Sequence, residues 1–322
     1  MSQISFKDRV AIITGAGGGL GRTYALDIAR RGGAVVVNDL GGSVQGPGDS
    51  SDMADRVVAE IKAAGGRAIA NYDSVASSDG AQRIVDSALK AFGRIDALIN
   101  NAGNMRVNNF ENYSDDDLVS ILSVHLVGTF NVTKAAWSHM KAQGYGRVVF
   151  TASSAGMYGN EMYACYGAAK AGITGLMNVL AHEGKPHGIL CNVLMPNALS
   201  RMTDMVEAEL AKAGNKIPVD ANAFMAAVKN SMDPNFTTGL AVYLASDACT
   251  STHAIYSSCA GRMARVFIGA TEGWHGSMET PATAEDIAKH FDVICDPLRG
   301  VHMPASPADE FRIVLTKPEP LV

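Results

Sequence analysis

Two residues with acid/base side chains, Tyr166 and Lys170, stand four positions apart in a stretch of small residues that favours a helix. This spacing places both side chains on one helix face. A phenol has an ordinary pKa of about 10, so a tyrosine that shuttles protons near neutrality needs a pKa roughly three units lower, which a nearby ammonium favours. Ser153, 13 residues before Tyr166, can hydrogen-bond a substrate oxygen as charge develops there. The three residues predict proton transfer at a secondary alcohol or ketone.

A glycine-rich turn near the start of the chain predicts the partner of this proton transfer. It directly follows an apolar run, opens a helical pattern, and contains G-x-x-x-G-x-G at Gly15, Gly19 and Gly21. Glycine permits positive φ angles and lets the backbone approach a pyrophosphate, whose charge is favoured by a helix N-terminus. We therefore expect a dinucleotide cofactor and hydride transfer. The positive nicotinamide ring of such a cofactor would add to the lowering of the tyrosine pKa.

The acid at the end of the next apolar run, Asp39, indicates which dinucleotide binds. It lies 18 positions after Gly21, where an adenosine ribose is expected. A carboxylate accepts hydrogen bonds from ribose hydroxyls and repels a 2′-phosphate, so we expect NAD rather than NADP. Arg22 is the nearby cation that argues for NADP. Asp73, just past the third apolar run, is a candidate contact of the adenine, and the turn at 100–103 can pass beneath a ribose.

The elements that must position these residues alternate in type along the chain. Short β-branched runs predict strands, and the amphipathic stretches between them predict helices. This alternation implies right-handed crossovers and a doubly wound parallel sheet with helices on both faces, which is a Rossmann-type α/β fold. The predicted strands cover residues 10–14, 34–38, 67–71, 95–99, 147–151, 189–194 and 254–257.

We expect a single domain with a C-terminal extension. The Rossmann domain is predicted over residues 1–258, and the extension, packed on the same domain, over 259–322, because no linker, repeat or low-complexity tract divides them. Residues 197–236 are rich in Pro, Gly and Asn and predict a mobile segment that covers the substrate. In the extension, 263–269 predicts an extra strand and 283–295 an amphipathic helix.

Composition argues against several classes of protein. The net charge is −5 and the pI about 5.9, and the basic residues are scattered, so we expect no nucleic-acid partner. Apolar runs are shorter than the roughly 20 residues of a membrane span, so no membrane partner is expected either. The five cysteines form no C-x-x-C pair and neither end carries a targeting signal, which predicts a cytoplasmic location. His182 and His187 are wrongly spaced for a zinc helix, so no metal is expected.

The order and spacing of these motifs resemble the short-chain dehydrogenase/reductase family from residue 7 to about 258. The resemblance implies that Tyr166 is the acid/base, that Lys170 holds the nicotinamide ribose and lowers the tyrosine pKa, and that Ser153 orients the substrate oxygen. A fourth catalytic position, usually an Asn that supports a water relay, is occupied by His125. The motifs and the resemblance together predict these cofactor contacts: Gly15, Gly19, Leu20, Gly21, Asp39, Asp73, Asn101, Ala102, Gly103, Tyr166, Lys170 and Pro196.

A narrower resemblance includes the histidine. Segments around Asp39, His125, Ser153 and 196–203 are similar to the (3R)-hydroxyacyl-CoA dehydrogenase domain of peroxisomal multifunctional enzyme type 2, the 17β-hydroxysteroid dehydrogenase type 4 group, in which this His is usual. The resemblance implies NAD-dependent oxidation of a (3R)-hydroxyacyl-CoA with a fatty or steroid side chain, by a homodimer or homotetramer. Because no hydratase or sterol-carrier domain follows, we expect a free-standing enzyme.

Two other functions stay open on the sequence. A hydroxysteroid or other alcohol dehydrogenase that does not use CoA would need the same catalytic residues, and no compact basic cluster marks a site for the phosphates of CoA. A regulatory protein could bind the cofactor and lack the chemistry. The intact set of Ser153, Tyr166 and Lys170 favours an enzyme over the regulatory protein.

Overall fold

The structure is a computed structural model that describes residues 3–43, 45, 48, 50–199 and 227–315. The chain divides into two compact units, Met1–Arg265 and Val266–Val322. This division lies after the predicted boundary at Ser258, because a tight turn returns the chain to the sheet. Both residues of that turn, Ala260 and Gly261, have positive φ (47° and 83°), as two-residue hairpin turns require. Packing of the extension on the first unit stays a prediction.

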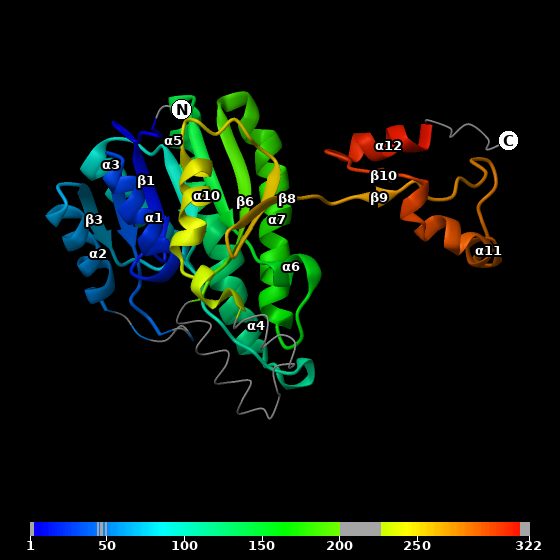
Figure 1. Ribbon diagram of the computed structural model, residues 1–322, viewed down its shortest axis with the longest axis horizontal. Coiled ribbons are helices and arrows are strands. Elements are labelled where there is room, and N and C mark those ends of the chain that lie inside the picture. The colour runs from blue at the N-terminus through cyan, green and yellow to red at the C-terminus, as the bar shows by residue number, and fades with distance from the viewer. Residues whose placement is uncertain (1–2, 44, 46–47, 49, 200–226, 316–322) are drawn as a thin grey trace. The chain divides into compact units, whose positions relative to one another are not determined.

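The first unit is built around one eight-stranded sheet with the order β3-β2-β1-β4-β5-β6-β7-β8 (Figure 1). The pairs from β3 to β7 are all parallel. The chain starts in the middle of the sheet, runs outward to β3 and then returns past β1 to β4. The predicted doubly wound parallel sheet is therefore confirmed, and its switch point, where ligands bind in such sheets, lies between β1 and β4.

The strand bounds agree with the predicted ones at β1, β2 and β3 and differ elsewhere. The strand β4 starts at Ala97, the residue that pairs with Ala11 of β1, and β6 continues to Asn197 because its pairing with β7 extends that far. The strands are Val10–Thr14 (β1), Ala34–Asn38 (β2), Arg67–Asn71 (β3), Ala97–Asn100 (β4), Gly146–Thr151 (β5), Ile189–Asn197 (β6), Ala254–Cys259 (β7) and Arg262–Val266 (β8).

Helices cover the sheet in two groups. In one group α1 packs against α2 and α10, and in the other α3 packs against α5, which contacts α7. The predicted cover at 197–236 falls mostly outside the described residues. The helices are α1 (Gly19–Arg30), α2 (Asp52–Ala63), α3 (Ser78–Phe92), α4 (Asp115–Leu122), α5 (Gly128–Gln143), α6 (Ser154–Tyr158), α7 (Ala164–Gly184) and α10 (Asn235–Ala245), with short turns η1 (Phe110–Asn112), η2 (Ser123–Val127), η3 (Lys185–His187) and η4 (Lys229–Ser231).

The elements α4, η2 and α5 form one continuous helical stretch over 115–143. By length and composition alone this 29-residue stretch could cross a membrane, and the core helix of a water-soluble domain passes the same test. Here it packs against α3, α7 and the strands β4 and β5. Its middle turn, η2, is a π-helix, a form that often marks a functional position.

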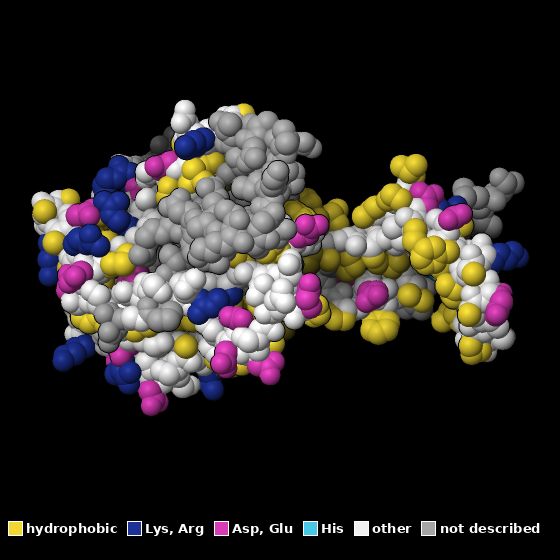
Figure 2. Space-filling model, turned by 90° about the horizontal axis from the view of Figure 1, so that it is seen from below, with side chains coloured by type: hydrophobic (Ala, Val, Ile, Leu, Met, Phe, Trp, Pro, Cys, Tyr) yellow, Lys and Arg dark blue, Asp and Glu magenta, His cyan; other side chains and the backbone are white. Residues whose placement is uncertain are grey.

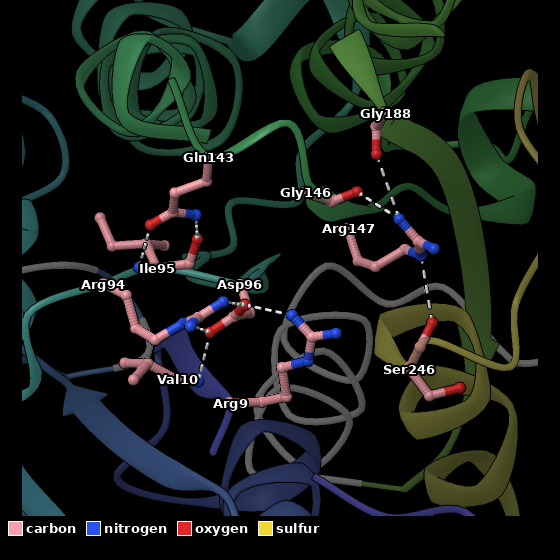
Figure 3. Close-up of polar contacts among 10 residues, drawn as sticks. All are labelled: Arg9, Val10, Arg94, Ile95, Asp96, Gln143, Gly146, Arg147, Gly188 and Ser246. Atoms are coloured by element: carbon pink, nitrogen blue, oxygen red, sulfur yellow. Dashed lines mark hydrogen bonds and ion pairs between the residues drawn. The ribbon is translucent and has the colours of Figure 1, made fainter. Parts of the chain in front are cut away.

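A polar network holds the amino-terminal edge of the sheet (Figure 3). The Asp96 carboxylate is 1% exposed and accepts hydrogen bonds from Arg9 Nη1 at 2.8 Å and Arg94 Nη2 at 2.7 Å. Arg147, also buried, donates its Nε hydrogen at 3.1 Å to the carbonyl oxygen of Ser246, just past the end of α10. These bonds join the starts of β1, β4 and β5 to α10, at the edge opposite the strand ends that carry the predicted site.

The second unit contains α11 (Ala284–Cys295), η5 (Pro297–Arg299) and α12 (Pro307–Leu315), with an antiparallel pair of β9 (Ala270–Thr271) and β10 (Val301–His302). The predicted helix is confirmed: Thr283 is its N-cap and forms a capping box with Asp286. Trp274 stacks on His290 of α11, with the ring centroids 4.2 Å apart. No hydrophobic side chain between residues 266 and 314 is fully buried, and Figure 2 shows many of them on the surface of this unit.

Candidate active site

A cavity of about 570 Å³ lies at the carboxyl ends of β1, β2, β4, β5 and β6. All four predicted catalytic residues line it: Ser153, Tyr166, Lys170 and His125. The predicted cofactor contacts that also line it are Gly15, Gly19, Leu20, Asp39, Asp73, Asn101, Ala102, Gly103 and Pro196. One fold thus gathers residues that are spread over most of the first unit's sequence.

The glycine turn forms a cradle that fits a pyrophosphate. Its N-cap, Gly18, makes no side-chain cap bond, and the first turn of α1 carries no acidic residue, so the backbone N–H groups there remain for a negative ligand. Gly21 lies outside the cavity lining, unlike the prediction. A Cβ at Gly21 would stand 2.4 Å from the carbonyl oxygen of Gly15, so this glycine serves the packing beneath the turn.

Asn101 holds the glycine turn in place. Its Nδ2 donates to the carbonyl oxygens of Thr14 at 3.0 Å and Gly15 at 3.1 Å. In return, the buried hydroxyl of Thr14 accepts the N–H groups of Asn101 and Ala102, both at 3.0 Å. Sequence reasoning assigned no role to Thr14, because a threonine that ends a buried strand carries no signal of its own.

The two predicted acids of the adenosine end have different surroundings. Each oxygen of Asp39 accepts one backbone N–H, from Gly17 and from Gly41, both at 2.8 Å. The Asp73 carboxylate is held by Asn71 at 2.9 Å and by an ion pair with Arg83 at 2.6 Å. Asp39 is therefore fixed by the backbone at the cavity, and the adenine contact of Asp73 stays a prediction.

The helix α7 carries both Tyr166 and Lys170, as the spacing of four predicted. The Lys170 Nζ donates a hydrogen bond at 2.7 Å to the carbonyl oxygen of Thr151 and lies 5.5 Å from the centroid of the Tyr166 ring. Ser153 follows β5 and is the N-cap of α6, with its hydroxyl 3.2 Å from the Ala155 nitrogen. The strand end and the helix thus bring the three side chains to one cavity.

Burial shifts the pKa values of the two α7 groups in opposite directions. It raises the pKa of Tyr166 to about 12, against a lowering effect of the Ser153 hydroxyl, and it lowers the pKa of Lys170 to about 7. The protein by itself therefore disfavours the phenolate, because removal from water outweighs the other influences. The lowering expected from the sequence also counts on the positive nicotinamide ring, so it stays a prediction for the enzyme with its cofactor bound. A positive charge in the cavity would favour the phenolate.

His125 lies on the π-turn η2 and is 1% exposed. Its Nε2 is 2.8 Å from the carbonyl oxygen of Asn104 and 3.2 Å from that residue's nitrogen, and the shorter contact assigns the proton to Nε2. The Nδ1 atom is then a buried acceptor, and it has no protein partner among the described residues. Burial, followed by the charge of Lys170, lowers the pKa of His125 well below its usual range, so the ring is neutral.

Two further buried polar atoms of the cavity have no partner within the described part of the chain. They are the Asn104 Oδ1 and the Thr151 Oγ1. Buried polar atoms are rarely left unpaired, so these atoms and His125 Nδ1 fit a bound polar ligand or ordered water.

Comparison with known proteins identifies the family. Residues 9–214 match the family model described as short chain dehydrogenase. The chain belongs to the short-chain dehydrogenase family. Over 296 residues it is 43% identical to the peroxisomal multifunctional enzyme type 2 of Mus musculus, covering 92% of this chain and 38% of the mouse protein.

Two further relatives resemble this short-chain dehydrogenase over most of its length. A short-chain type dehydrogenase/reductase of Mycobacterium tuberculosis is 41% identical over 290 residues, 90% of this chain and 95% of that protein. The full-length peroxisomal multifunctional enzyme type 2 of Drosophila melanogaster superposes with a TM-score of 0.77 at 30% identity, over 97% of this chain and 49% of that one. The chain thus spans less than half the length of the two peroxisomal enzymes.

Membership in the family defines the type of activity. The family consists of oxidoreductases that use NAD or NADP and act on small molecules. Within the described ranges, no group of three His, Cys, Asp or Glu side chains could hold a metal ion.

Proposed function

We propose that this short-chain dehydrogenase oxidises a (3R)-hydroxyacyl-CoA to the 3-ketoacyl-CoA with reduction of NAD. The observation that carries the reaction type is the convergence of Ser153, Tyr166 and Lys170 in one cavity with the glycine turn. The choice of substrate is supported by the resemblance of the segments around His125 and Ser153 to the (3R)-hydroxyacyl-CoA dehydrogenase domain, and by the 43% identity to the mouse enzyme.

In this proposal Tyr166 accepts the hydroxyl proton of the substrate. The Ser153 hydroxyl hydrogen-bonds the substrate oxygen while it changes from alcohol to ketone. When bound, NAD would supply the hydride acceptor for the substrate carbon, and a positive charge beside Tyr166 that would favour the phenolate. Lys170, beside Tyr166 and held by the Thr151 carbonyl, keeps further N–H groups that can bind the ribose of the cofactor.

The surroundings of Asp39 support NAD over NADP. Each carboxylate oxygen accepts a single backbone N–H and so keeps lone pairs for ribose hydroxyls. Arg22, the cation that argued for NADP, forms an ion pair with Glu60 at 2.5 Å and does not line the cavity. A 2′-phosphate would therefore meet a fixed negative charge.

His125 has a separate proposed role in the supply and removal of protons. Tyr166 is half-buried and its ring packs against the imidazole of His125, and the neutral His125 offers a free acceptor at Nδ1 close to Lys170. We propose that a water held by Nδ1 connects Lys170 to the outside. In this position a histidine replaces the family's usual Asn as the acceptor.

We also propose that the enzyme is a cytoplasmic homodimer or homotetramer. All five cysteines are free thiols, as is usual in a reducing compartment. The helices that carry His125 and Tyr166 expose apolar side chains, among them Val119 at 59% and Val179 at 56%, which favours burial against a second copy. Light scattering of the purified protein tests this, and a monomeric mass contradicts it.

The substrate is tested by NADH formation with a panel of (3R)- and (3S)-hydroxyacyl-CoA esters and free hydroxysteroids. The proposal predicts activity with the (3R) thioesters and little with the (3S) isomers. Activity with free steroids and none with any thioester would replace it by an alcohol dehydrogenase that does not use CoA. No NADH from any alcohol, with the cofactor still bound, would favour the regulatory protein.

A further inference from the structure

Two segments that are far apart in the sequence line the catalytic end of the cavity. Asn104 and Met105 belong to the first, and Asn160 and Tyr163 to the second. The first segment contacts His125 through Asn104, and the second leads directly into α7, where Tyr163 stands 6.0 Å from Tyr166 between ring centroids. The spacing of these two segments therefore affects what fits beside the catalytic groups.

One phenol joins the two segments. The hydroxyl of Tyr113, just before α4, shares its one hydrogen between the carbonyl oxygen of Met162 at 2.7 Å and that of Arg106 at 3.0 Å. The Met162 carbonyl also accepts the N–H of Asn108 at 3.1 Å. Burial raises the pKa of Tyr113 to about 12, so its hydroxyl keeps the proton that it donates.

The backbone of Met162 depends on these contacts. Its φ is 65°, in the left-handed region that residues other than glycine seldom adopt. The next residue, Tyr163, is the N-cap of α7. Because the Tyr113 hydroxyl and the Asn108 N–H both donate to the Met162 carbonyl, they help to hold the conformation from which the helix with Tyr166 starts.

The ring of Tyr113 is anchored in the body of the domain. It packs against a small buried cluster of Ile121, Cys165 and Ala169, and Tyr166 packs against the same cluster. The hydroxyl of Tyr113 therefore has a fixed origin from which it can restrain both segments.

We propose that Tyr113 is a positioning residue that clamps segment 104–108 to segment 160–163 and so sets the width of the catalytic end of the cavity. The clamp takes no part in proton or hydride transfer, so it affects how well the substrate is held rather than the chemical step. This inference rests on the proposed function, which supplies the class of substrate. The kinetic test itself can use any alcohol that the wild-type enzyme oxidises.

The test compares Tyr113→Phe with Tyr256→Phe. The control removes the hydroxyl of Tyr256, which is also half-buried. It lies 2.7 Å from the Ser251 hydroxyl near the start of β7, and neither residue lines the cavity. With the best substrate of the wild type, Tyr113→Phe is expected to raise KM by about five- to tenfold with kcat within about twofold, as for the loss of one hydrogen bond that restrains the site. Cofactor affinity should not change, and Tyr256→Phe should behave as the wild type.

Hydrogen exchange gives a readout that needs no substrate. In Tyr113→Phe the amides of 104–113 and 160–166 should exchange faster than in the wild type and in Tyr256→Phe, with other segments unchanged. Unchanged KM and unchanged exchange overturn the clamp, and so does a loss in kcat at constant KM. If the wild type oxidises no hydroxyacyl-CoA, the proposed function fails, and the exchange comparison still decides whether Tyr113 clamps the two segments.

Discussion

The imidazole of His125 stands edge-on to the phenol ring of Tyr166, with 5.2 Å between the ring centroids and an interplanar angle of 89°. The π-turn η2 brings the imidazole to this position, because the extra residue in the turn changes which side chains face α7. The contact leaves His125 Nδ1 free of protein partners among the described residues, in the cavity that contains the catalytic groups. This relationship is the basis of the first prediction.

Removing the acceptor at position 125 should slow proton exchange without weakening cofactor binding. We expect His125→Ala to lower kcat by about tenfold or more, within the range of general acid/base contributions, and to increase the solvent isotope effect. His125→Asn restores a hydrogen-bond acceptor and should lose less. Steady-state kinetics in H₂O and D₂O check this, and an alanine variant with normal kcat in both solvents would exclude His125 from the relay.

The charge of Asp39 should determine the choice between the two cofactors. Asp39→Ala is expected to reduce the preference for NAD over NADP by about tenfold, which corresponds to roughly 1.4 kcal/mol, because the repulsion of the 2′-phosphate is lost. Arg22→Ala is the control, since Arg22 is paired with Glu60 outside the cavity. The ratio of kcat/KM values for the two cofactors measures the effect. An unchanged ratio in Asp39→Ala would mean that this carboxylate only holds the backbone of Gly17 and Gly41 and does not select the cofactor.

Lys170 is expected to be required for activity and to lower the stability of the folded protein. Its folded pKa of about 7 lies below the ordinary 10.5, so the unfolded chain binds the proton more tightly. Stability is therefore lowered at every pH below about 7 and recovers between about 7 and 10.5. Lys170→Met should be inactive yet unfold at a higher temperature than the wild type at pH 6. The difference in unfolding temperature between the variant and the wild type should shrink at pH 9. Thermal unfolding of both proteins at pH 6 and pH 9 measures this, and a variant that is less stable than the wild type at pH 6 contradicts the prediction.

The network around Asp96 should contribute to stability and not to catalysis (Figure 3). Removal of this buried carboxylate leaves Arg9 and Arg94 without their shared partner. Asp96→Ala is expected to lower the free energy of unfolding by about 3 kcal/mol, whereas Glu60→Ala, at an exposed pair, should cost less than about 1 kcal/mol. Urea unfolding measures both, and equal losses in the two variants would contradict the importance of burial.

Periodicity and motif spacing predicted the parallel sheet, and every site residue that the sequence predicted, except Gly21, lines the cavity. They succeeded because buried strands are rich in β-branched residues. The glycine turn and Asp39 each follow a strand, and Tyr166 lies on a helix, so each has a fixed place in the fold. They failed where the outcome depends on tertiary contacts. Gly21 and Thr14 lie in the same motif as Gly15, and only the packing against Asn101 shows which of them line the cavity and which support it.

Electrostatics was the part that the sequence could least predict. The spacing of Tyr166 and Lys170 suggested a lowered tyrosine pKa, whereas burial, which spacing does not reveal, raises the pKa of Tyr166 in the protein without its cofactor. In the same way the π-turn at His125 and the clamp by Tyr113 arise from contacts between distant segments. No local pattern in the chain marks either of them.

The most direct test of the account compares wild type with Tyr166→Phe in the reduction of NAD by a (3R)-hydroxyacyl-CoA. The account predicts NADH formation by the wild type, and in the variant an unchanged affinity for NAD with nearly complete loss of turnover. Retained turnover in Tyr166→Phe would contradict the assignment of Tyr166 as the group that takes the substrate proton.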